Sequence, residues 1–331
     1  MDRRRFVGGV ALGCVVAPFA VGAEQAARVP RIGVLALPRL DLPDVQLLAD
    51  AFRQGLREHG YVEGQNIVVE YRSAGGKAEL LPDLASEFVD LKVDVIVVGG
   101  AQIVRAVQQA TTTVPIVATG LFDPVEDGFA TSLARPGRNV TGLSFLGPEL
   151  VPKRLEFLKQ MLPAASRIAG LWQPGAMGEH ATKEMLSEAE AVAQKLEMQL
   201  RLKAVTVSGD LEGAFSTIAR ERPDALIVFP SNVLFFERQR IGELTARHGL
   251  PSMHYAREFV VAGGLMSYGP SLADLWRRGA TYVDKILKGA KPGNLPIEQP
   301  DKFDLVINRK TAMALGISIP QSLAMRADEM I

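Results

Sequence analysis

The sequence predicts an α/β protein built from two doubly wound, Rossmann-like lobes that are joined by a hinge. Short apolar segments alternate with longer amphipathic ones from Arg31 onward, and the alternation begins again near Ile168. Continuous apolar strands separated by helices are typical of a parallel sheet that is covered on both faces. The join between the two series, at 142–148, contains no low-complexity linker, which favours two apposed lobes over two independent domains.

The elements of the first lobe follow from β-branched runs and from the helical period. The expected strands are 31–37, 67–71, 94–99 and 115–119, and the expected helices are 44–59, 78–91 and 102–112. Residues 94–99 read DVIVVG and are nearly all apolar, as expected for a strand with both faces buried. The first helix should end before Gly60, because glycine is favoured just past a helix end.

The second lobe repeats this order. The expected strands are 168–172, 199–204, 225–229 and 251–255, and the expected helices are 182–196, 211–220 and 235–248. A last helix at 272–287 and a last strand at 303–307 begin no third unit, so we interpret them as segments that return to complete each lobe. The expected first lobe is therefore 31–143 plus about 264–292, and the second is 147–263 plus about 300–331.

Residues 1–23 predict a signal peptide. A basic run at Arg3 to Arg5 precedes an apolar stretch at 7–21, and small residues place cleavage after Ala23. The run RRRFV is similar to the twin-arginine motif, so both the general and the twin-arginine export routes stay open. An uncleaved anchor is the alternative, although the apolar stretch is shorter than the roughly 20 residues that a spanning helix needs. Cys14 leaves lipidation as a further alternative.

Composition and missing motifs exclude several function classes. The 37 basic and 37 acidic residues balance, which gives no electrostatic reason to expect nucleic acid as a partner. The only cysteine lies in the leader, and the 4 histidines show no metal-ligand spacing. The sequence contains no phosphate loop, no dinucleotide-binding glycine motif and no nucleophile elbow. We expect no cofactor and no metal. Nothing in these patterns argues for catalysis, although an enzyme stays open, since it would need only an acid and a base that converge in the cleft.

The candidate binding site lies between the lobes. Ligands of open parallel sheets bind beyond the carboxyl ends of the strands, so two facing sheets form an interlobe cleft. The loops that follow the expected strands supply these candidate residues: Gly99, Gly100, Ala101, Gln102, Asp123, Pro124, Trp172, Ser231, Asn232, Tyr255 and Glu258.

Each candidate has a structural alternative. The glycines at Gly99 and Gly100 let backbone N–H groups approach a ligand carboxylate, or they only form a tight turn into the next helix. Asp123 accepts a hydrogen bond from a ligand ammonium, or it caps the helix that begins near Val125. Trp172 and Tyr255 form flat walls of the site, or they belong to the core.

Several longer motifs carry a resemblance to a known family. They are FDPV at 122–125, SLARPGRNVTG at 132–142, the segment 257–269, and NRKTA with the segment that follows it at 308–329. From about Arg31 to its end, the chain resembles the ABC-transporter substrate-binding family that includes the tryptophan- and tyrosine-type binding proteins. The resemblance implies the type I periplasmic-binding fold with a three-stranded hinge, and it adds Tyr268 to the candidate residues. It also implies a periplasmic monomer that delivers a small ligand to an ABC permease in the inner membrane.

Two departures from the family pattern bear on the ligand. Family members often have a Gly-Thr/Ser-Pro turn where this chain has Gly100-Ala101-Gln102, and many have Asp where this chain has Asn232. The expected ligand is an amino acid or a related carboxylate, and the missing hydroxyl and carboxylate leave open a ligand other than an aromatic amino acid. A ligand-sensing accessory protein or the effector domain of a transcription regulator would share the architecture.

Overall fold

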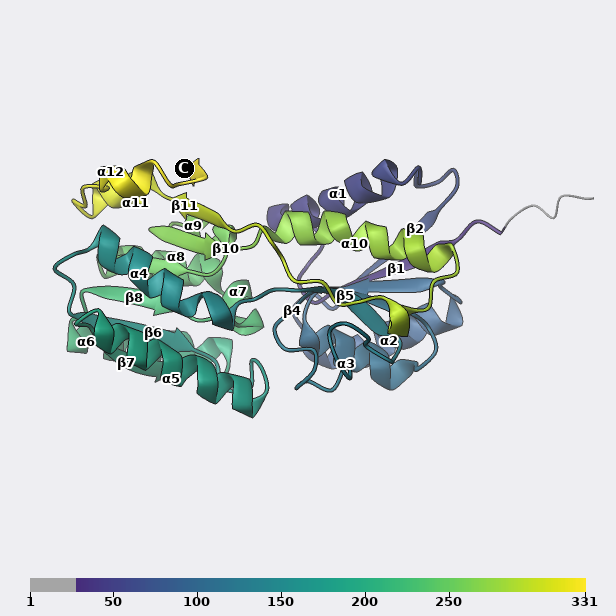
Figure 1. Ribbon diagram of the computed structural model, residues 1–331, viewed down its shortest axis with the longest axis horizontal. Coiled ribbons are helices and arrows are strands. Elements are labelled where there is room, and N and C mark those ends of the chain that lie inside the picture. Colours follow the sequence, from purple (N-terminus) through teal and green to yellow (C-terminus); the bar gives the residue numbers. More distant parts are fainter. Residues whose placement is uncertain (1–27) are drawn as a thin grey trace, which may run out of the picture.

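Two β-sheets, each with helices on both faces, form the two lobes of this protein (Figure 1). The computed structural model describes residues 28–331, apart from the side chain of Asp44. The expected signal peptide lies outside the described residues. The predicted fold class is confirmed, because the two sheets are built mainly of parallel strands and are wound separately.

The first lobe contains the five-stranded sheet, which is parallel throughout and has the order β2-β1-β3-β4-β5. Its elements are β1 (Arg31–Ala36), α1 (Pro43–Glu58), β2 (Val68–Ser73), η1 (Ala78–Leu80), α2 (Leu81–Asp90), β3 (Val95–Val98), α3 (Ala101–Ala110), β4 (Ile116–Leu121) and β5 (Val140–Ser144). The central strand β3 is buried along its whole length, as its apolar sequence predicts.

The second lobe contains the seven-stranded sheet, with the order β12-β11-β10-β9-β8-β6-β7. Its first elements are η2 (Pro148–Leu150), α4 (Val151–Met161), β6 (Arg167–Trp172), α5 (Glu179–Lys195), β7 (Gln199–Ala204), η3 (Ser208–Asp210), α6 (Leu211–Glu221), β8 (Ala225–Val228), α7 (Asn232–Phe236), α8 (Arg238–Arg247), β9 (Ser252–His254), α9 (Arg257–Val261) and β10 (Met266–Gly269). The expected helix at 235–248 is divided at Glu237 into the end of α7 and all of α8.

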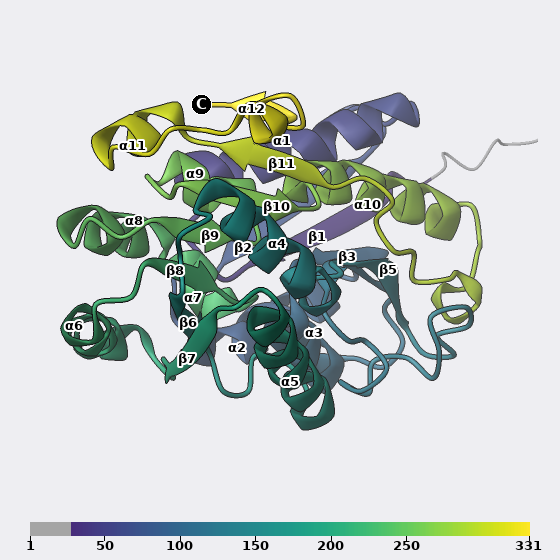
Figure 2. The same cartoon turned by 60° about the vertical axis from the view of Figure 1, so that its left-hand side comes forward.

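The chain then returns once to each lobe. The returning elements are α10 (Leu272–Leu287), η4 (Pro292–Asn294), β11 (Asp304–Ile307), α11 (Arg309–Ala314), α12 (Gln321–Ala324) and β12 (Glu329–Met330). Helix α10 lies beside α1 on one face of the first sheet, while α2 and α3 lie on the other (Figures 1 and 2). Strand β10 pairs with β9 and with antiparallel β11, so the return to the first lobe begins after Gly269, rather than at about 264.

Strands β5 and β10 were not expected, and both lie next to a crossing between the lobes. At Gly142 in β5, φ is 132° and an added Cβ would lie 2.0 Å from the carbonyl oxygen of Ala118. Only glycine permits this conformation and this backbone approach. The join between the lobes was expected at 142–148, so the end of this strand was counted as part of the join.

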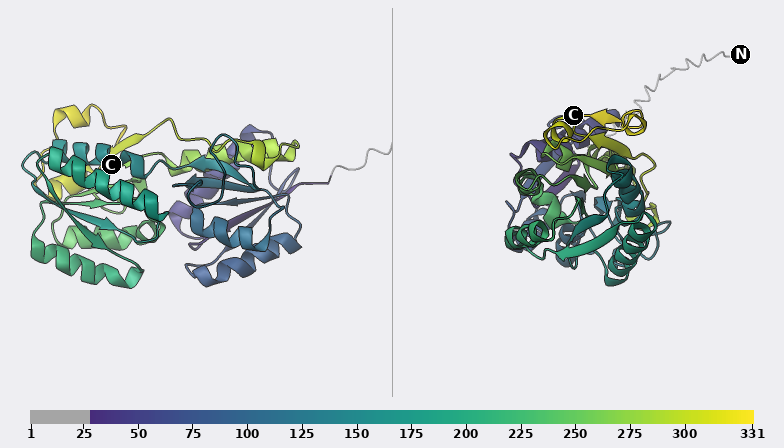
Figure 3. Two further views of the ribbon diagram at one scale, coloured as in Figure 1. Left: turned by 60° about the horizontal axis from the view of Figure 1, so that its bottom comes forward. Right: turned by 90° about the vertical axis from the view of Figure 1, so that its left-hand side faces the viewer.

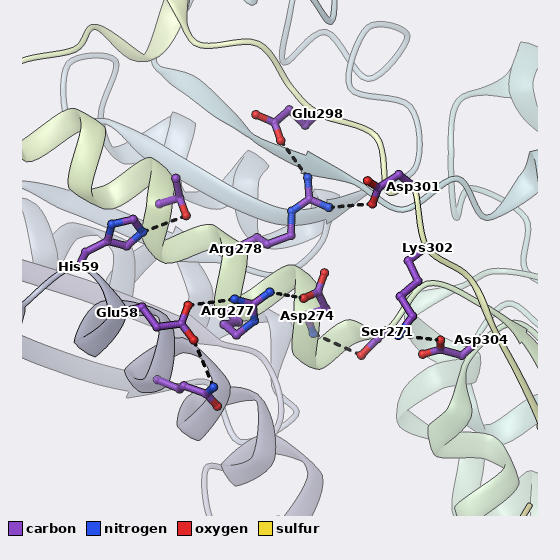
Figure 4. A network of polar contacts seen from close by, with 12 residues as sticks. Glu58, His59, Ser271, Asp274, Arg277, Arg278, Glu298, Asp301, Lys302 and Asp304 are labelled. Atoms are coloured by element: carbon purple, nitrogen blue, oxygen red, sulfur yellow. Dashed lines mark hydrogen bonds and ion pairs between the residues drawn. The ribbon is translucent and has the colours of Figure 1, made fainter. Parts of the chain in front are cut away.

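The described chain crosses between the lobes three times, between β5 and η2, between β10 and α10, and before β11 (Figures 1 and 3). The first and third crossings lie side by side. The N–H of Ser144 donates to the carbonyl of Glu298 over 2.9 Å, and the N–H of Glu298 donates to the carbonyl of Gly142 over 3.0 Å. Arg278 of α10 pairs with the carboxylates of Glu298 at 2.8 Å and Asp301 at 3.7 Å, and so fastens the third crossing to the first lobe (Figure 4).

Arg154 of α4 connects the first and second crossings from within the second lobe. Its guanidinium donates through Nη1 to the Gly147 carbonyl over 2.6 Å and through Nε to the Tyr268 carbonyl over 2.8 Å. The side chain is fully buried, and burial lowers its pKa to about 9. It is therefore still charged at neutral pH, and it satisfies two backbone carbonyls at the hinge.

Apolar packing continues from one lobe into the other. One buried cluster contains Val34 and Trp276 of the first lobe together with Leu234 and Phe259 of the second. On the opposite faces, each lobe has a separate core, one beneath α2 and α3 and one beneath α4 and α5. The shared cluster therefore runs from the core between the first sheet and helices α1 and α10, through the seam, to the core beneath α6 and α8 of the second lobe.

Candidate functional site

A cavity lies in the seam between the lobes, at the carboxyl ends of the strands. It contains about 970 Å³ of atom-free space, part of which is open to solvent. The first lobe lines it with the segment after β1, the start of α3, the end of β4 and one face of α10, and the second lobe lines it with α7 and the end of β9.

Aromatic side chains form much of the cavity wall. They are Tyr71, Phe122, Phe145, Phe235, Phe236, Tyr255 and Trp276. Phe145, at the first crossing, makes edge-to-face contacts with Phe122 of the first lobe at 5.5 Å and with Tyr255 of the second at 5.8 Å between ring centroids. Such walls suit a ligand with a flat apolar body.

Tyr255 is held in place by its hydroxyl group, which donates to the Ser231 carbonyl over 2.6 Å. The residue is 3% exposed, and burial raises the pKa of its hydroxyl. The Ser231 side chain accepts from the N–H of Leu234 over 3.1 Å and thereby caps α7. This cap fixes the start of α7, where Asn232 faces the cavity.

The two lobes approach closely at Gly100 and Asn232. A Cβ added to Gly100 would lie 2.8 Å from the Asn232 Nδ2, and φ at this glycine is 93°. A side chain at this position would therefore be strained and would push the lobes apart. Gly100 also precedes α3, and no side chain caps that helix. The first N–H groups of α3 therefore have no side-chain cap, and the helix begins at the cavity wall.

Arg238 is the one charged residue among the described residues that line the cavity. Its Nη1 donates to the Phe235 carbonyl over 2.8 Å, and its Cζ lies 4.7 Å from the centroid of the Phe235 ring. Burial lowers its pKa, while the nearby Glu258 carboxylate opposes that change. Burial in turn raises the pKa of Glu258, which is 9% exposed and does not line the cavity.

Tyr71, on β2, supplies a polar group at the other side of the cavity. Its hydroxyl oxygen is buried and has no hydrogen-bond partner of good geometry among the described residues. Burial raises its pKa to about 12, although the Arg53 guanidinium, 4.8 Å from the ring centroid, acts in the opposite direction. The hydroxyl is therefore protonated at neutral pH and can donate to a ligand.

The candidate residues from the sequence divide between the cavity and other places. Gly99, Gly100, Asn232 and Tyr255 line the cavity, whereas the following do not: Ala101, Gln102, Asp123, Pro124, Trp172, Ser231, Glu258 and Tyr268. Gln102 is exposed, one position further along α3 than the buried Ala101. Trp172 packs against the core of the second lobe, and the Tyr268 ring packs against Phe157.

Asp123 caps a turn of its own segment. Its Oδ1 accepts from the N–H groups of Val125 at 3.2 Å and Glu126 at 2.9 Å, so the carboxylate has the capping role of the structural alternative. The helix that was expected near Val125 is wrong, because the segment after Asp123 forms turns only. It lines a second pocket together with three glutamates, among them Glu149. The pKa of Glu149 is raised, first by burial and also by the neighbouring Asp123 carboxylate.

Trp276 is the residue that sequence reasoning missed most completely. It lies on α10, which returns to the first lobe far along the chain, and a Cβ on Gly99 would lie 3.2 Å from its ring. Nothing in the order of elements indicated that α10 faces the cleft. Phe235 and Phe236 could have been found, because they follow Asn232 within one helical turn.

A carboxylate of the first lobe caps a helix of the second. Glu126 accepts from the N–H of His180 over 2.7 Å and from the N–H of Ala181 over 2.9 Å, at the start of α5. A negative charge is favourable at a helix N-terminus, where N–H groups lack partners. Because these bonds join the two lobes, they exist only while the lobes are together.

Residues 28–331 contain neither a metal-binding cluster nor a membrane-spanning helix. No group of three or more His, Cys, Asp and Glu side chains is placed there to hold a metal ion. Over the same residues, no helix is both long enough and apolar enough to cross a membrane.

Two separately wound lobes with a cavity at their strand ends define the type I periplasmic-binding fold. The chain belongs to the family described as ABC transporter substrate binding protein, whose model matches residues 33–331. It is a substrate-binding protein of an ABC transporter.

Relatives and solved structures cover nearly the same length. A tyrosine-binding protein of Clostridioides difficile is 26% identical over 287 residues, which are 86% of this chain and 81% of that protein. The ABC domain from Streptococcus pneumonia in complex with L-Trp has a TM-score of 0.82 at 25% identity, over 91% of this chain and 99% of that one. A conserved domain protein from Vibrio cholerae has a TM-score of 0.82 at 29% identity, over 92% of this chain and 100% of that one.

Proposed function

We propose that this protein is the extracytoplasmic solute-binding component of an ABC uptake system, and that it binds a small ligand with a flat apolar body between its lobes. The observation that carries the proposal is the aromatic cavity at the carboxyl ends of the strands of both sheets. Two relatives support it, since one is a tyrosine-binding protein and the other was solved with L-Trp. The protein acts as a monomer, in the periplasm, and it releases the ligand unchanged.

Ligand binding is coupled to the separation of the lobes. The ligand first contacts one lobe, and rotation about the three crossings then brings the other lobe over it. Contacts that form only in the closed arrangement determine how far the ligand shifts the population toward it. The Gly100–Asn232 contact and the Glu126 cap on α5 are contacts of this kind. The closed, loaded protein docks both lobes on the permease of the inner membrane.

A thermal-shift screen of the mature protein, residues 24–331, tests the proposal. The panel contains amino acids, aromatic and aliphatic acids, nucleosides and small peptides. Binding to the folded state at a hundredfold excess over Kd stabilises it by about 2.7 kcal/mol, which raises the Tm measurably. No shift with any compound, for protein shown to be folded and free of ligand, would refute the proposal.

A pair of matched variants assigns the binding to the cavity. Phe236→Ala removes a half-buried ring from the cavity wall and should abolish the shift, whereas Phe303→Ala removes a half-buried ring that packs on Tyr268 outside the cavity. Each variant is compared with its own ligand-free Tm, so that a loss of stability is not mistaken for a loss of binding. Equal ligand shifts in the two variants would place the ligand elsewhere.

A further inference from the structure

The second pocket also lies in the seam, and it adjoins the aromatic cavity at Phe122, which lines both. It contains about 800 Å³ of atom-free space, part of which is open to solvent. The first lobe contributes the segment after β4 and the end of β5, and the second lobe contributes η2 and one face of α5. Because both lobes form its wall, the pocket has this shape only while the lobes are together.

Acidic side chains from both lobes line the second pocket. Among the described residues that line it there is no lysine, arginine or histidine, and the carboxylates are those of Asp123 in the first lobe and Glu149, Glu184 and Glu188 in the second. The one basic group of the described chain within 4.0 Å of any of them is the exposed imidazole of His180, whose Nε2 lies 4.0 Å from Glu184. Burial, and after it the Asp123 carboxylate, raises the pKa of Glu149, so charges interact across the seam.

A buried hydroxyl group without a partner also lines this pocket. Ser144 is 2% exposed, and its Oγ has no hydrogen-bond partner among the described residues. Its neighbours in β5, Leu143 and Phe145, belong to the cluster that the lobes share on one face of the sheet. Side chains alternate along a strand, so that of Ser144 is directed to the opposite face, where the second pocket lies. A hydrogen-bonding group in the pocket would supply the partner that this hydroxyl lacks.

An organic ammonium suits these groups better than a metal ion. Over residues 28–331, no three side chains of Asp, Glu, His and Cys are placed to hold a metal. Apolar side chains line the pocket as well, among them Leu133, Leu146 and Met185. A short alkyl chain with an ammonium group at each end can pair with carboxylates of both lobes while its methylene groups contact this apolar surface.

We infer that the second pocket binds an alkyl diamine, whose two ammonium groups pair with carboxylates of both lobes. The site is separate from the aromatic cavity, so the inference goes beyond the proposed function and does not depend on the ligand of that cavity. The diamine offsets the repulsion between like charges that face one another across the seam.

Calorimetric titration of the mature protein with 1,4-diaminobutane, at constant ionic strength, tests the inference. The diamine should bind at one site, butylamine should bind about fivefold or more weakly because it has one ammonium group, and 1,4-butanediol should not bind. Absence of diamine binding, or an equal Kd for butylamine, would overturn the inference. So would Ca²⁺ or Mg²⁺ that displaces the diamine at a lower concentration than the diamine itself requires, since the pocket would then be a metal site.

Matched variants locate the bound diamine. Asp123→Asn keeps the oxygen that caps its turn and removes the charge of the first lobe, and Glu188→Gln removes a charge of the second. Each should weaken the Kd about three- to fivefold, whereas Glu190→Gln, at an exposed position of α5 outside the pocket, should not change it. Ser144→Ala should weaken it about threefold, whereas Ser267→Ala removes another buried hydroxyl without a partner, outside the pocket, and should not.

The variant Phe236→Ala separates this inference from the proposed function. Phe236 lines the aromatic cavity and not the second pocket, so the variant should keep the Kd for 1,4-diaminobutane. A weaker diamine Kd in this variant would place the diamine in the aromatic cavity and overturn the inference, while the proposed function would stand. An unchanged Kd in either Asp123→Asn or Glu188→Gln would also overturn it, since the diamine would then not join the lobes. If the diamine binds as expected and no compound of the broad screen does, the proposed function fails and the inference stands.

Discussion

Glu126 provides a test of whether lobe contact contributes to ligand affinity. Its carboxylate belongs to the first lobe and accepts two N–H bonds at the start of α5 in the second, at 2.7 and 2.9 Å. The substitution Glu126→Ala removes both acceptors and the charge. Because the side chain is exposed, the two bonds are screened by solvent and salt, and we take their combined contribution as about 1–2 kcal/mol.

This free energy belongs to the closed arrangement, because the bonds break when the lobes separate. If the ligand is retained only in the closed arrangement, the apparent Kd rises by the factor by which the closed population falls. A loss of about 1–2 kcal/mol corresponds to a Kd that is about 5–30-fold weaker. The difference should shrink at high salt, since the charge on the helix end is then screened.

Calorimetric titration with a ligand from the screen measures this change. Glu190→Ala is the matched control, because it removes an exposed carboxylate from a later turn of α5, away from the helix start that Glu126 caps. Circular dichroism establishes that both variants are folded. A Kd for Glu126→Ala within twofold of the wild-type value would refute the reasoning, since the cap would then not favour the closed arrangement.

Three further predictions concern stability, each measured by urea unfolding. Arg154→Met leaves two buried carbonyls at the hinge without a donor, which should lower the free energy of unfolding by about 1–3 kcal/mol for each carbonyl. The loss of a buried charge partly offsets this decrease. An unchanged urea midpoint would contradict the prediction. Burial lowers the pKa of His254 to about 3, from a value near 6.5 in the unfolded chain. Below pH 6.5 the unfolded state therefore binds a proton that the folded state does not, and the free energy of unfolding falls, by about 2 kcal/mol at pH 5. His254→Gln should remove that part of the pH dependence, and equal slopes for the two proteins between pH 7.5 and 5 would count against it. Gly242→Ala places a Cβ 1.9 Å from the Ala262 carbonyl oxygen and should destabilise the protein by about 1–3 kcal/mol. A Cβ on Gly213 would meet no heavy atom within 4 Å, so Gly213→Ala should stabilise the protein by about 0.5–1 kcal/mol. Effects of the same sign would be evidence against the steric explanation.

Part of the cavity wall was predictable because it depends on the ends of strands. Gly99 and Tyr255 end strands that the apolar runs had already located, Gly100 comes directly after one, and Asn232 follows another within a few residues. Gln102 and Trp172 lie in the same loops or at the same strand ends but point elsewhere. A change of one position turns a side chain through about 100° on a helix and to the other face of a strand, so the loop alone does not identify the residue.

The remaining wall depends on contacts between distant segments. Tyr71 lines the cavity because β2 pairs with β1, and Trp276 lines it because α10 returns to pack beside α1. The charge of the wall has the same origin. Asp123 was a candidate partner for the ammonium of a ligand in the cavity until the fold placed it in a separate pocket, and Arg238 enters the wall because α8 begins directly after α7.

By itself, the sequence determined the class of fold and the existence of two lobes. A continuous apolar run and a helical period of 3.6 residues are local properties of a segment, so they indicate a strand or a helix whatever the rest of the chain does. The tertiary structure alone decided the hinge, the composition of the cavity and the cap of Glu126 on α5. Each depends on segments that are far apart in the chain, such as β5 against β4, where a Cβ on Gly142 would lie 2.0 Å from the Ala118 carbonyl oxygen and only glycine fits.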